Sequence, residues 1–271
     1  MDLLKEKYGW GNAPDETAGP YILKCRKFVE NDEAFSNFRR DFDYGKILSG
    51  DPKIVGDIAI DSIKKFNQFN FLLDNLDEIK KNDKVGNPYL YEYDQLGEIN
   101  PSTLKYFNTI VEIKPLIGDY VTKKIVEIGG GYGGLCRIFD SFYDFEEYII
   151  IDLPDAIKLA EKYLNYFPKL NGKVKYISCE EFSNYDSIEN VDLFIADSSI
   201  AECNLQTQNL YRDKIAKNSK HIYVAWNTHH LPNGNSEKLN FIDGFGDDFL
   251  YQDILLDGSV HIIYIKKENV N

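Results

Sequence analysis

The sequence lacks the features that define several common protein classes. No apolar run approaches the roughly 18 residues of a transmembrane helix, and residues 1–10 contain no apolar segment of the secretory-signal type. Four cysteines (Cys25, Cys136, Cys179 and Cys203) stand far apart without a C-x-x-C pair, which argues against a zinc ribbon or a disulfide framework. We therefore expect a cytoplasmic protein with no membrane insertion.

Basic residues are also scarce. The 271 residues include 31 Lys and Arg against 44 Asp and Glu, a formal net charge of −13. Such a chain has no general attraction for phosphate backbones or anionic lipids, so we expect no nucleic-acid partner. Hydrophobic residues make up 43% and aromatic residues 14%, which is enough for a large folded core.

The most informative segment is residues 124–134, KIVEIGGGYGG, in which an apolar run ends in five glycines. A strand that turns into a helix through glycines lets the backbone approach a nucleotide closely. Gly129, Gly131 and Gly134 fit the dinucleotide pattern G-x-G-x-x-G, whereas Gly129, Gly131 and Gly133 fit the looser pattern of S-adenosylmethionine (SAM) sites. Glu127 favours SAM, because an acid there can meet the ammonium group of its methionine half and would repel a pyrophosphate.

The chain changes character near residue 120, and we predict two regions. Residues 1–120 form a mainly helical lid and acceptor-binding region, and residues 121–271 form a SAM-binding α/β domain. Strands are predicted at residues 124–128, 148–153, 174–179, 191–196, 221–226, 249–256 and 261–265, and helices at 133–142, 154–167, 204–216 and about 236–241. Asp257 and Gly258 should join the last two strands as a hairpin. Five strands with helices and then a hairpin predict a Rossmann-like, seven-stranded sheet with one antiparallel strand, the class I methyltransferase fold.

Further cofactor contacts are predicted at the ends of the second and third strands. Asp152 lies about twenty residues after the glycine turn, where an acid can accept both ribose hydroxyls. The alternative is that Asp152 only caps the helix that begins at Pro154. Cys179, at the end of the third strand, should flank the adenine. Together with Leu153 and the glycine loop, these residues make up the predicted cofactor site.

An acceptor site is predicted at the same edge of the sheet. Asp197 and Glu202 follow the fourth strand, and His229 and His230 follow the fifth. A histidine, of which His230 is the better candidate, could act as the general base on a hydroxyl. Histidine and carboxylates could also hold a divalent ion, or the cluster could be only a hydrogen-bond network. Whether a metal is present stays open.

The region before residue 120 also carries signals. Asn100 and Pro101 predict a helix that runs to about Glu112 and stops before Pro115. Tyrosines at 89, 91 and 93 alternate on an extended stretch, and Tyr91 could cover SAM or stack on a sugar, or else pack the helices onto the sheet. Arg39 and Arg40 are expected on solvated faces rather than on a diphosphate. This apolar and aromatic region is also compatible with a homodimer.

The chain resembles the bacterial sugar O-methyltransferases encoded in gene clusters for capsular polysaccharide and lipopolysaccharide biosynthesis. The resemblance is carried by residues 85–93, 99–106, 126–135 and 151–154 and by the pair Ala201-Glu202. It implies SAM as cofactor and a sugar hydroxyl as acceptor, on a nucleotide-activated or lipid-linked saccharide. Asp197-Ser198 departs from the Ser-Asn expected after the fourth strand. Two alternatives remain: an NAD-dependent sugar oxidoreductase and a catalytically silent SAM-fold interaction module.

Overall fold

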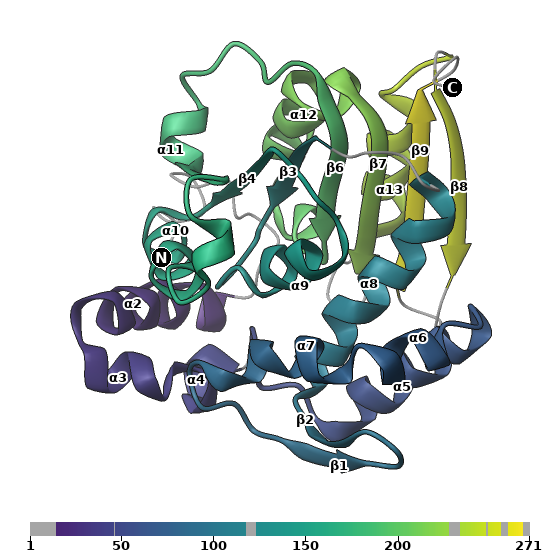
Figure 1. The fold of residues 1–271 in the computed structure, drawn as a ribbon. Coiled ribbons are helices and arrows are strands. Elements are labelled where there is room, and N and C mark those ends of the chain that lie inside the picture. Colours follow the sequence, from purple (N-terminus) through teal and green to yellow (C-terminus); the bar gives the residue numbers. More distant parts are fainter. Residues whose placement is uncertain are drawn as a thin grey trace.

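A mixed sheet of seven strands forms the centre of the computed structural model, which describes residues 15–45, 47–117, 123–227, 234–247, 249–255 and 260–267 (Figure 1). The strands are β3 (Lys124–Ile128), β4 (Glu147–Asp152), β5 (Val174–Ser178), β6 (Val191–Asp197), β7 (Ser219–Asn227), β8 (Phe249–Leu255) and β9 (Val260–Lys267). Their order is β5-β4-β3-β6-β7-β9-β8, and β9 runs antiparallel to both of its neighbours. This is the strand order of the class I methyltransferase fold, so the predicted fold class is confirmed.

The helices fall into two groups along the chain. Those between the strands of the sheet are α9 (Gly134–Phe142), α10 (Pro154–Leu164), α11 (Cys179–Phe182), α12 (Leu205–Lys214) and α13 (Gly234–Asp243). Those before the sheet are α2 (Asp15–Glu30), α3 (Asp32–Ser36), α4 (Phe42–Gly45), α5 (Lys53–Lys65), α6 (Phe69–Asp74), α7 (Leu76–Lys80) and α8 (Pro101–Ile117). A small hairpin of β1 (Tyr91–Tyr93) and β2 (Gly97–Ile99) precedes α8. No helix in the described ranges is long and apolar enough to cross a bilayer.

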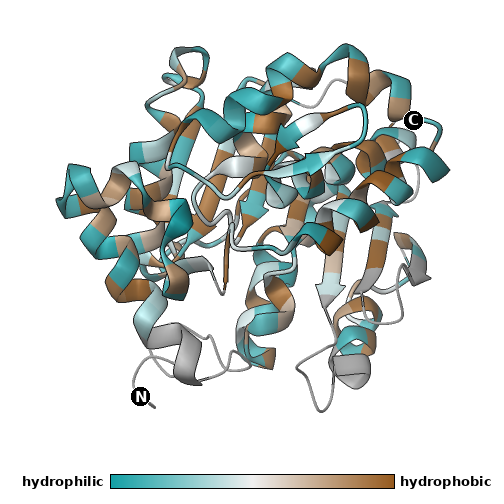
Figure 2. Ribbon diagram, turned by 90° about the horizontal axis from the view of Figure 1, so that it is seen from below, coloured by the Kyte–Doolittle hydropathy of each residue, from teal (hydrophilic) through white to brown (hydrophobic). Residues whose placement is uncertain are grey.

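The large sheet is covered on both faces by apolar cores. Along β4, Tyr148 and Ile150 belong to one core and Ile149 and Ile151 to the other, as the alternation of side chains along a strand requires. The first core includes residues of α2, α5, α8, α9 and α10, and the second includes residues of α12 and α13. In Figure 2 apolar colour runs along the strands, whereas the helices alternate between apolar and polar segments. Burial on both faces explains the nearly continuous apolar runs of the strands.

Aromatic contacts join the region before the sheet to the segments that follow β3 and β4. Phe38 packs against Tyr132 and Tyr163, with ring centroids 5.5 and 6.3 Å apart. Phe107 of α8 lies 5.5 Å from Phe142 of α9. The first core is therefore shared by both regions, and the predicted division at residue 120 stays a prediction.

Most predicted elements after residue 120 agree with the structure, with ends that differ by at most three residues. The main correction concerns α8. It begins at Pro101, with Ser102 N–H donating to Asn100 Oδ1 over 3.0 Å, but it continues through Pro115 to Ile117. The expected stop at Glu112 is therefore wrong. Pro115 has no N–H to donate to the carbonyl of Val111, so α8 loses one hydrogen bond in its last turn but still extends two residues beyond the proline. The predicted turn at Asp257-Gly258 lies outside the described residues.

Candidate functional site

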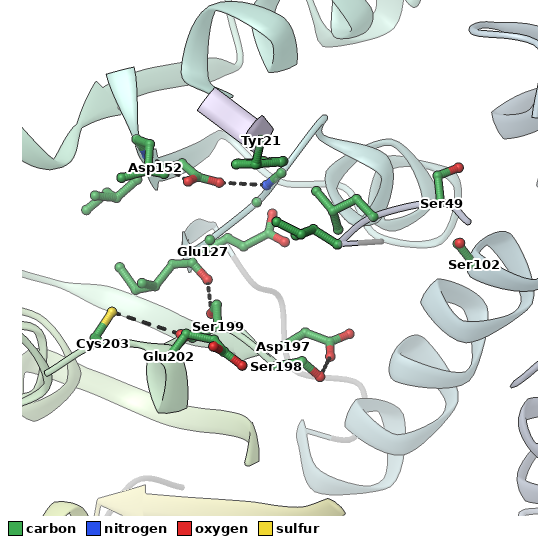
Figure 3. Close-up of a pocket in the computed structure, with 18 of the residues that line it drawn as sticks. Tyr21, Ser49, Ser102, Glu127, Asp152, Asp197, Ser198, Ser199, Glu202 and Cys203 are labelled. Carbon is green, nitrogen blue, oxygen red and sulfur yellow. Dashed lines mark hydrogen bonds between the residues drawn. The ribbon is translucent and has the colours of Figure 1, made fainter. Parts of the chain in front are cut away.

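A pocket lies at the carboxyl ends of the central strands, where β3 is flanked by β4 on one side and β6 on the other (Figure 3). In an open α/β sheet this switch point is where ligands bind. The facing wall comes from α8 and the segment before α5. Eight predicted site residues line the pocket together: Glu127, Gly129, Gly131, Asp152, Leu153, Cys179, Asp197 and Glu202.

Two described residues of the prediction, Gly133 and Tyr91, are not brought into this group. Gly133 precedes α9 in a left-handed conformation (φ 87°) and does not line the pocket. Tyr91 lies in β1, packed against the first core and away from the pocket lining, which matches the packing alternative. His229 and His230 lie outside the described residues, so the histidine part of the acceptor site stays a prediction.

The loop that follows β3 is rich in glycine because its backbone adopts angles that only glycine takes easily. Gly129 and Gly131 have φ of 75° and 57°. A Cβ on Gly129 would lie 2.3 Å from Ser199 Cβ, and one on Gly131 would lie 2.4 Å from Leu48 Cδ1. The loop backbone is therefore approached closely from both sides, by Ser199 of the segment after β6 and by Leu48 of the segment before α5.

Glu127 is a buried carboxyl group that lines the pocket. Its side chain accepts a hydrogen bond of 2.9 Å from the Tyr148 hydroxyl, and the residue is 3% exposed. Burial raises the pKa of Glu127 to about 8, and the negative charges of Asp197 and Asp152 act in the same direction. A cation bound in the pocket would favour the ionised form of this group.

Asp152 ties the glycine loop to the end of β4. One carboxylate oxygen accepts from Gly131 N–H over 2.8 Å and the other from Leu153 N–H over 2.7 Å. Burial raises the pKa of Asp152 to about 6 in spite of these two bonds. The first helical position of α10 is Pro154, and the preceding Leu153 caps it without a side-chain bond. The alternative that Asp152 is merely a helix cap is therefore wrong.

Lys105 of α8 lines the pocket although the sequence did not predict it as a site residue. Its Nζ lies 3.5 Å from Asp197 Oδ1 and 3.4 Å from Ser198 Oγ. Thr109, one turn further along α8, donates to Asp197 Oδ2 over 3.0 Å. Asp197 raises the pKa of Lys105 against the lowering effect of burial. The spacing of Lys105 and Thr109 places both on one helix face, which is a sequence signal, but nothing local in the sequence names Asp197 as their partner.

Another buried carboxyl group, that of Glu112, lies further along α8 than Lys105 and Thr109. It accepts hydrogen bonds from the Tyr223 hydroxyl at 2.5 Å and from Asn108 Nδ2 at 2.6 Å. Burial raises the pKa of Glu112 to about 7, with Asp197 contributing in the same direction and the hydrogen bonds opposing. The polar residues of α8 thus continue from the pocket into the interior.

Arg39 corrects another expectation. Its side chain is wholly buried, so the predicted solvated face is wrong for this residue. The guanidinium group donates to Ser49 Oγ at 2.6 Å and to the Asn82 carbonyl at 2.7 Å, and lies 3.2 Å from Asp83. These bonds hold Ser49, a pocket residue, against the segment before β1. Arg40 is exposed, as expected.

Metal ligands were left open by the sequence. Within the described ranges, no three His, Cys, Asp or Glu side chains are grouped as a metal site. Since residues 228–233 are outside those ranges, the candidate arrangement of His229 or His230 with Asp197 and Glu202 is not addressed by this finding.

The whole chain has only distant similarities to known proteins. No family model matches it, and no curated protein matches it. Among solved structures, it is similar to the mitomycin 7-O-methyltransferase MmcR (12% identity, 62% of this chain and 57% of that one, TM-score 0.43). It is also similar to the pyocyanin biosynthetic protein PhzM (13% identity, 59% of this chain and 58% of that one, TM-score 0.43). A third similarity is to the methyltransferase domain of a bacterial Hen1 (10% identity, 60% of this chain and 97% of that one, TM-score 0.47).

The sequence identities and TM-scores of these matches are low. The matched region spans 57% and 58% of MmcR and PhzM. The fold assignment accordingly rests on the strand order of the sheet and on the antiparallel β9.

Proposed function

We propose that the protein is a SAM-dependent O-methyltransferase that acts on a sugar hydroxyl. The observation that carries the proposal is the carboxyl group of Glu127, buried beside the glycine loop and lining the same pocket as Asp152. A buried acid with one hydroxyl partner is suited to a ligand that brings a positive charge.

The residues of the pocket fit the parts of SAM. Glu127 would meet the methionine ammonium group, and Asp152 would accept the ribose hydroxyls while its bonds to Gly131 and Leu153 keep it in place. Leu153 and Cys179 would flank the adenine. Bound SAM supplies an electrophilic methyl group on a sulfonium centre.

The opposite wall supports a hydroxyl-bearing acceptor. Lys105, Asp197 and Ser198 are joined by polar contacts there, and the Asp51 carboxylate accepts a 2.7 Å hydrogen bond from Ser102. Transfer to an alcohol forms an O–C bond, breaks the methyl–sulfur bond and releases the hydroxyl proton. Asp197, or His230 as the sequence predicts, would take that proton as the general base. The family resemblance supports a sugar as the acceptor.

Calorimetric titration tests the cofactor and mass spectrometry tests the reaction. We expect saturable binding of S-adenosylhomocysteine (SAH) and none of NAD. A panel of nucleotide-sugars incubated with SAM should give a product that is heavier by one methyl group. Parallel reactions with a chelator would decide metal dependence. Binding of NAD without binding of SAH would overturn the proposal in favour of an oxidoreductase.

Other expectations stay predictions: a cytoplasmic location, a homodimer and the absence of a nucleic-acid partner. Sedimentation of the purified protein checks the dimer. Incubation of a total RNA preparation with labelled SAM checks the last point, because incorporation of label into RNA would contradict it.

A further inference from the structure

One wall of the pocket, called here the α8 wall, consists of Asp51, Ser102, Lys105, Asp197 and Ser198. Ser102 and Lys105 lie one turn apart on α8 and therefore on the same face. Ser102 Oγ donates to Asp51, and Lys105 pairs with Asp197. Two carboxylates, an ammonium group and two hydroxyls thus alternate along this wall.

The Asp197 carboxylate of the α8 wall is held from three directions, by two residues of the wall and by Thr109 behind it. Lys105 lies next to Oδ1, Ser198 Oγ donates to Oδ1 over 3.0 Å, and Thr109 donates to Oδ2. Ser198 makes its contacts from a left-handed backbone (φ 56°), which costs a non-glycine residue about 1 kcal/mol and is typically retained at functional sites. An ionised carboxylate has about four acceptor positions, so Asp197 keeps capacity for a further donor.

The charge balance of the pocket restricts what can bind against this wall. Among the described lining residues there are five carboxyl groups and one ammonium group, that of Lys105. Because Lys105 is already paired with Asp197, a phosphate or carboxylate entering here would lose water and meet acidic neighbours, with no second Lys or Arg among the described lining residues. A neutral polyol avoids both costs, because its hydroxyls donate to carboxylates and accept from an ammonium group.

We propose that the α8 wall selects an acceptor whose reacting part is an uncharged polyhydroxyl ring, with Lys105 and Asp51 as specificity-determining residues. Any phosphate of the acceptor then lies outside the pocket. The inference rests on the proposed function and deepens it by naming the class of acceptor.

The test uses SAH-saturated protein and ligand-observed NMR titration with methyl glycosides. Each probe set contains a neutral methyl glycoside, the matching methyl glycoside of the uronic acid and the matching sugar 1-phosphate, in gluco, galacto and manno configurations. We expect one neutral member to bind, and its two acidic counterparts to bind at least about tenfold more weakly.

Variants locate the effect. Lys105→Met and Asp51→Asn should each weaken the neutral probe about tenfold, as expected for one lost hydrogen bond to a charged group, and leave SAH affinity unchanged. Asp51→Asn should also narrow the gap between the neutral and the acidic probes. Lys53→Met is the matched control, because Lys53 pairs with Asp57 over 2.7 Å outside the pocket lining. This variant should bind all probes as the wild type does.

The outcomes separate the two proposals. If wild-type protein does not bind SAH, the proposed function is wrong. If SAH binds but an acidic probe binds as tightly as its neutral counterpart, or no probe binds, only the present inference is overturned. Unchanged probe affinity in both Lys105→Met and Asp51→Asn also overturns it. Should Lys105→Met not fold, Asp51→Asn and the comparison of wild-type affinities decide.

Discussion

The backbone N–H of Gly131 donates to the Asp152 carboxylate over 2.8 Å, so the glycine loop after β3 is fastened to the end of β4. The second carboxylate oxygen accepts from Leu153 N–H. Asp152 is thus held by the backbone on both oxygens while it lines the pocket, so under the proposed function it would accept ribose hydroxyls without first being ordered.

Replacement of Asp152 by Asn should weaken SAH binding. The amide keeps one acceptor oxygen but turns the other into a donor, so a backbone bond and a ribose contact are lost together. We expect a 10- to 100-fold loss of affinity, roughly the value of one or two hydrogen bonds to a charged group, measured by calorimetry. A 2′-deoxy analogue of SAH is the control. If the variant still prefers SAH to this analogue as strongly as the wild type does, Asp152 is not the ribose acceptor.

Glu127→Gln should weaken SAH binding by about 10- to 100-fold and leave adenosine binding unchanged, because only SAH carries the ammonium group that an ionised Glu127 would pair with. Calorimetric titrations with both ligands check this. Equal losses for SAH and adenosine would indicate damage to the whole pocket rather than a lost ion pair.

Because the pKa of Glu127 is raised to about 8, SAH binding should be coupled to the release of a proton. At pH 7 the empty pocket holds this carboxyl group mainly protonated, and an ammonium ligand selects the ionised form, so binding should release a proton from it. Titrations in buffers of different ionisation enthalpy measure that release. It should be smaller for Glu127→Gln than for the wild type, and equal release by both would contradict the assignment.

The sequence predicted what is encoded over short distances. The β3 run, its glycine turn and the start of α9 are adjacent in the chain, and the end of β4 follows from the Asp152-Leu153-Pro154 pattern, so the sequence could predict that residues of these segments line one pocket. Lys105 and Asp197 lie far apart in the chain, and their pairing depends on how α8 packs on the sheet. The burial of Arg39 could not be predicted for the same reason. A charged residue is expected at the surface unless its partners are known, and those partners come from three later segments.

Gly131→Ala should destabilise the protein more than Gly172→Ala does. Both glycines have positive φ (57° and 76°), but only a Cβ at 131 meets a neighbour, Leu48 Cδ1, at 2.4 Å, whereas a Cβ at 172 has nothing within 4 Å. We expect about 1 kcal/mol from the backbone at either site and up to about 1 kcal/mol more at 131, because the partly exposed Leu48 side chain must shift to make room. Urea unfolding measures the difference. Adding Leu48→Ala to each variant should relieve the crowding at 131 alone, and a double-mutant cycle without such coupling would contradict the argument.

Glu112 predicts how stability depends on pH. Its folded pKa, about 7, lies above the ordinary value of 4.5, so folding favours the protonated form. The stabilisation is fully present below about pH 4.5 and is lost as pH rises through 7. Glu112→Gln removes this titration, and after an amide flip of Asn108 its new N–H₂ can donate to Asn108 Oδ1, which has no partner among the described residues. Relative to the wild type, the variant should gain on the order of 3 kcal/mol between pH 5 and pH 9. Urea unfolding across this range tests it, with the exposed Glu92→Gln as control. Parallel profiles for Glu112→Gln and the wild type would show that Glu112 does not titrate in this window.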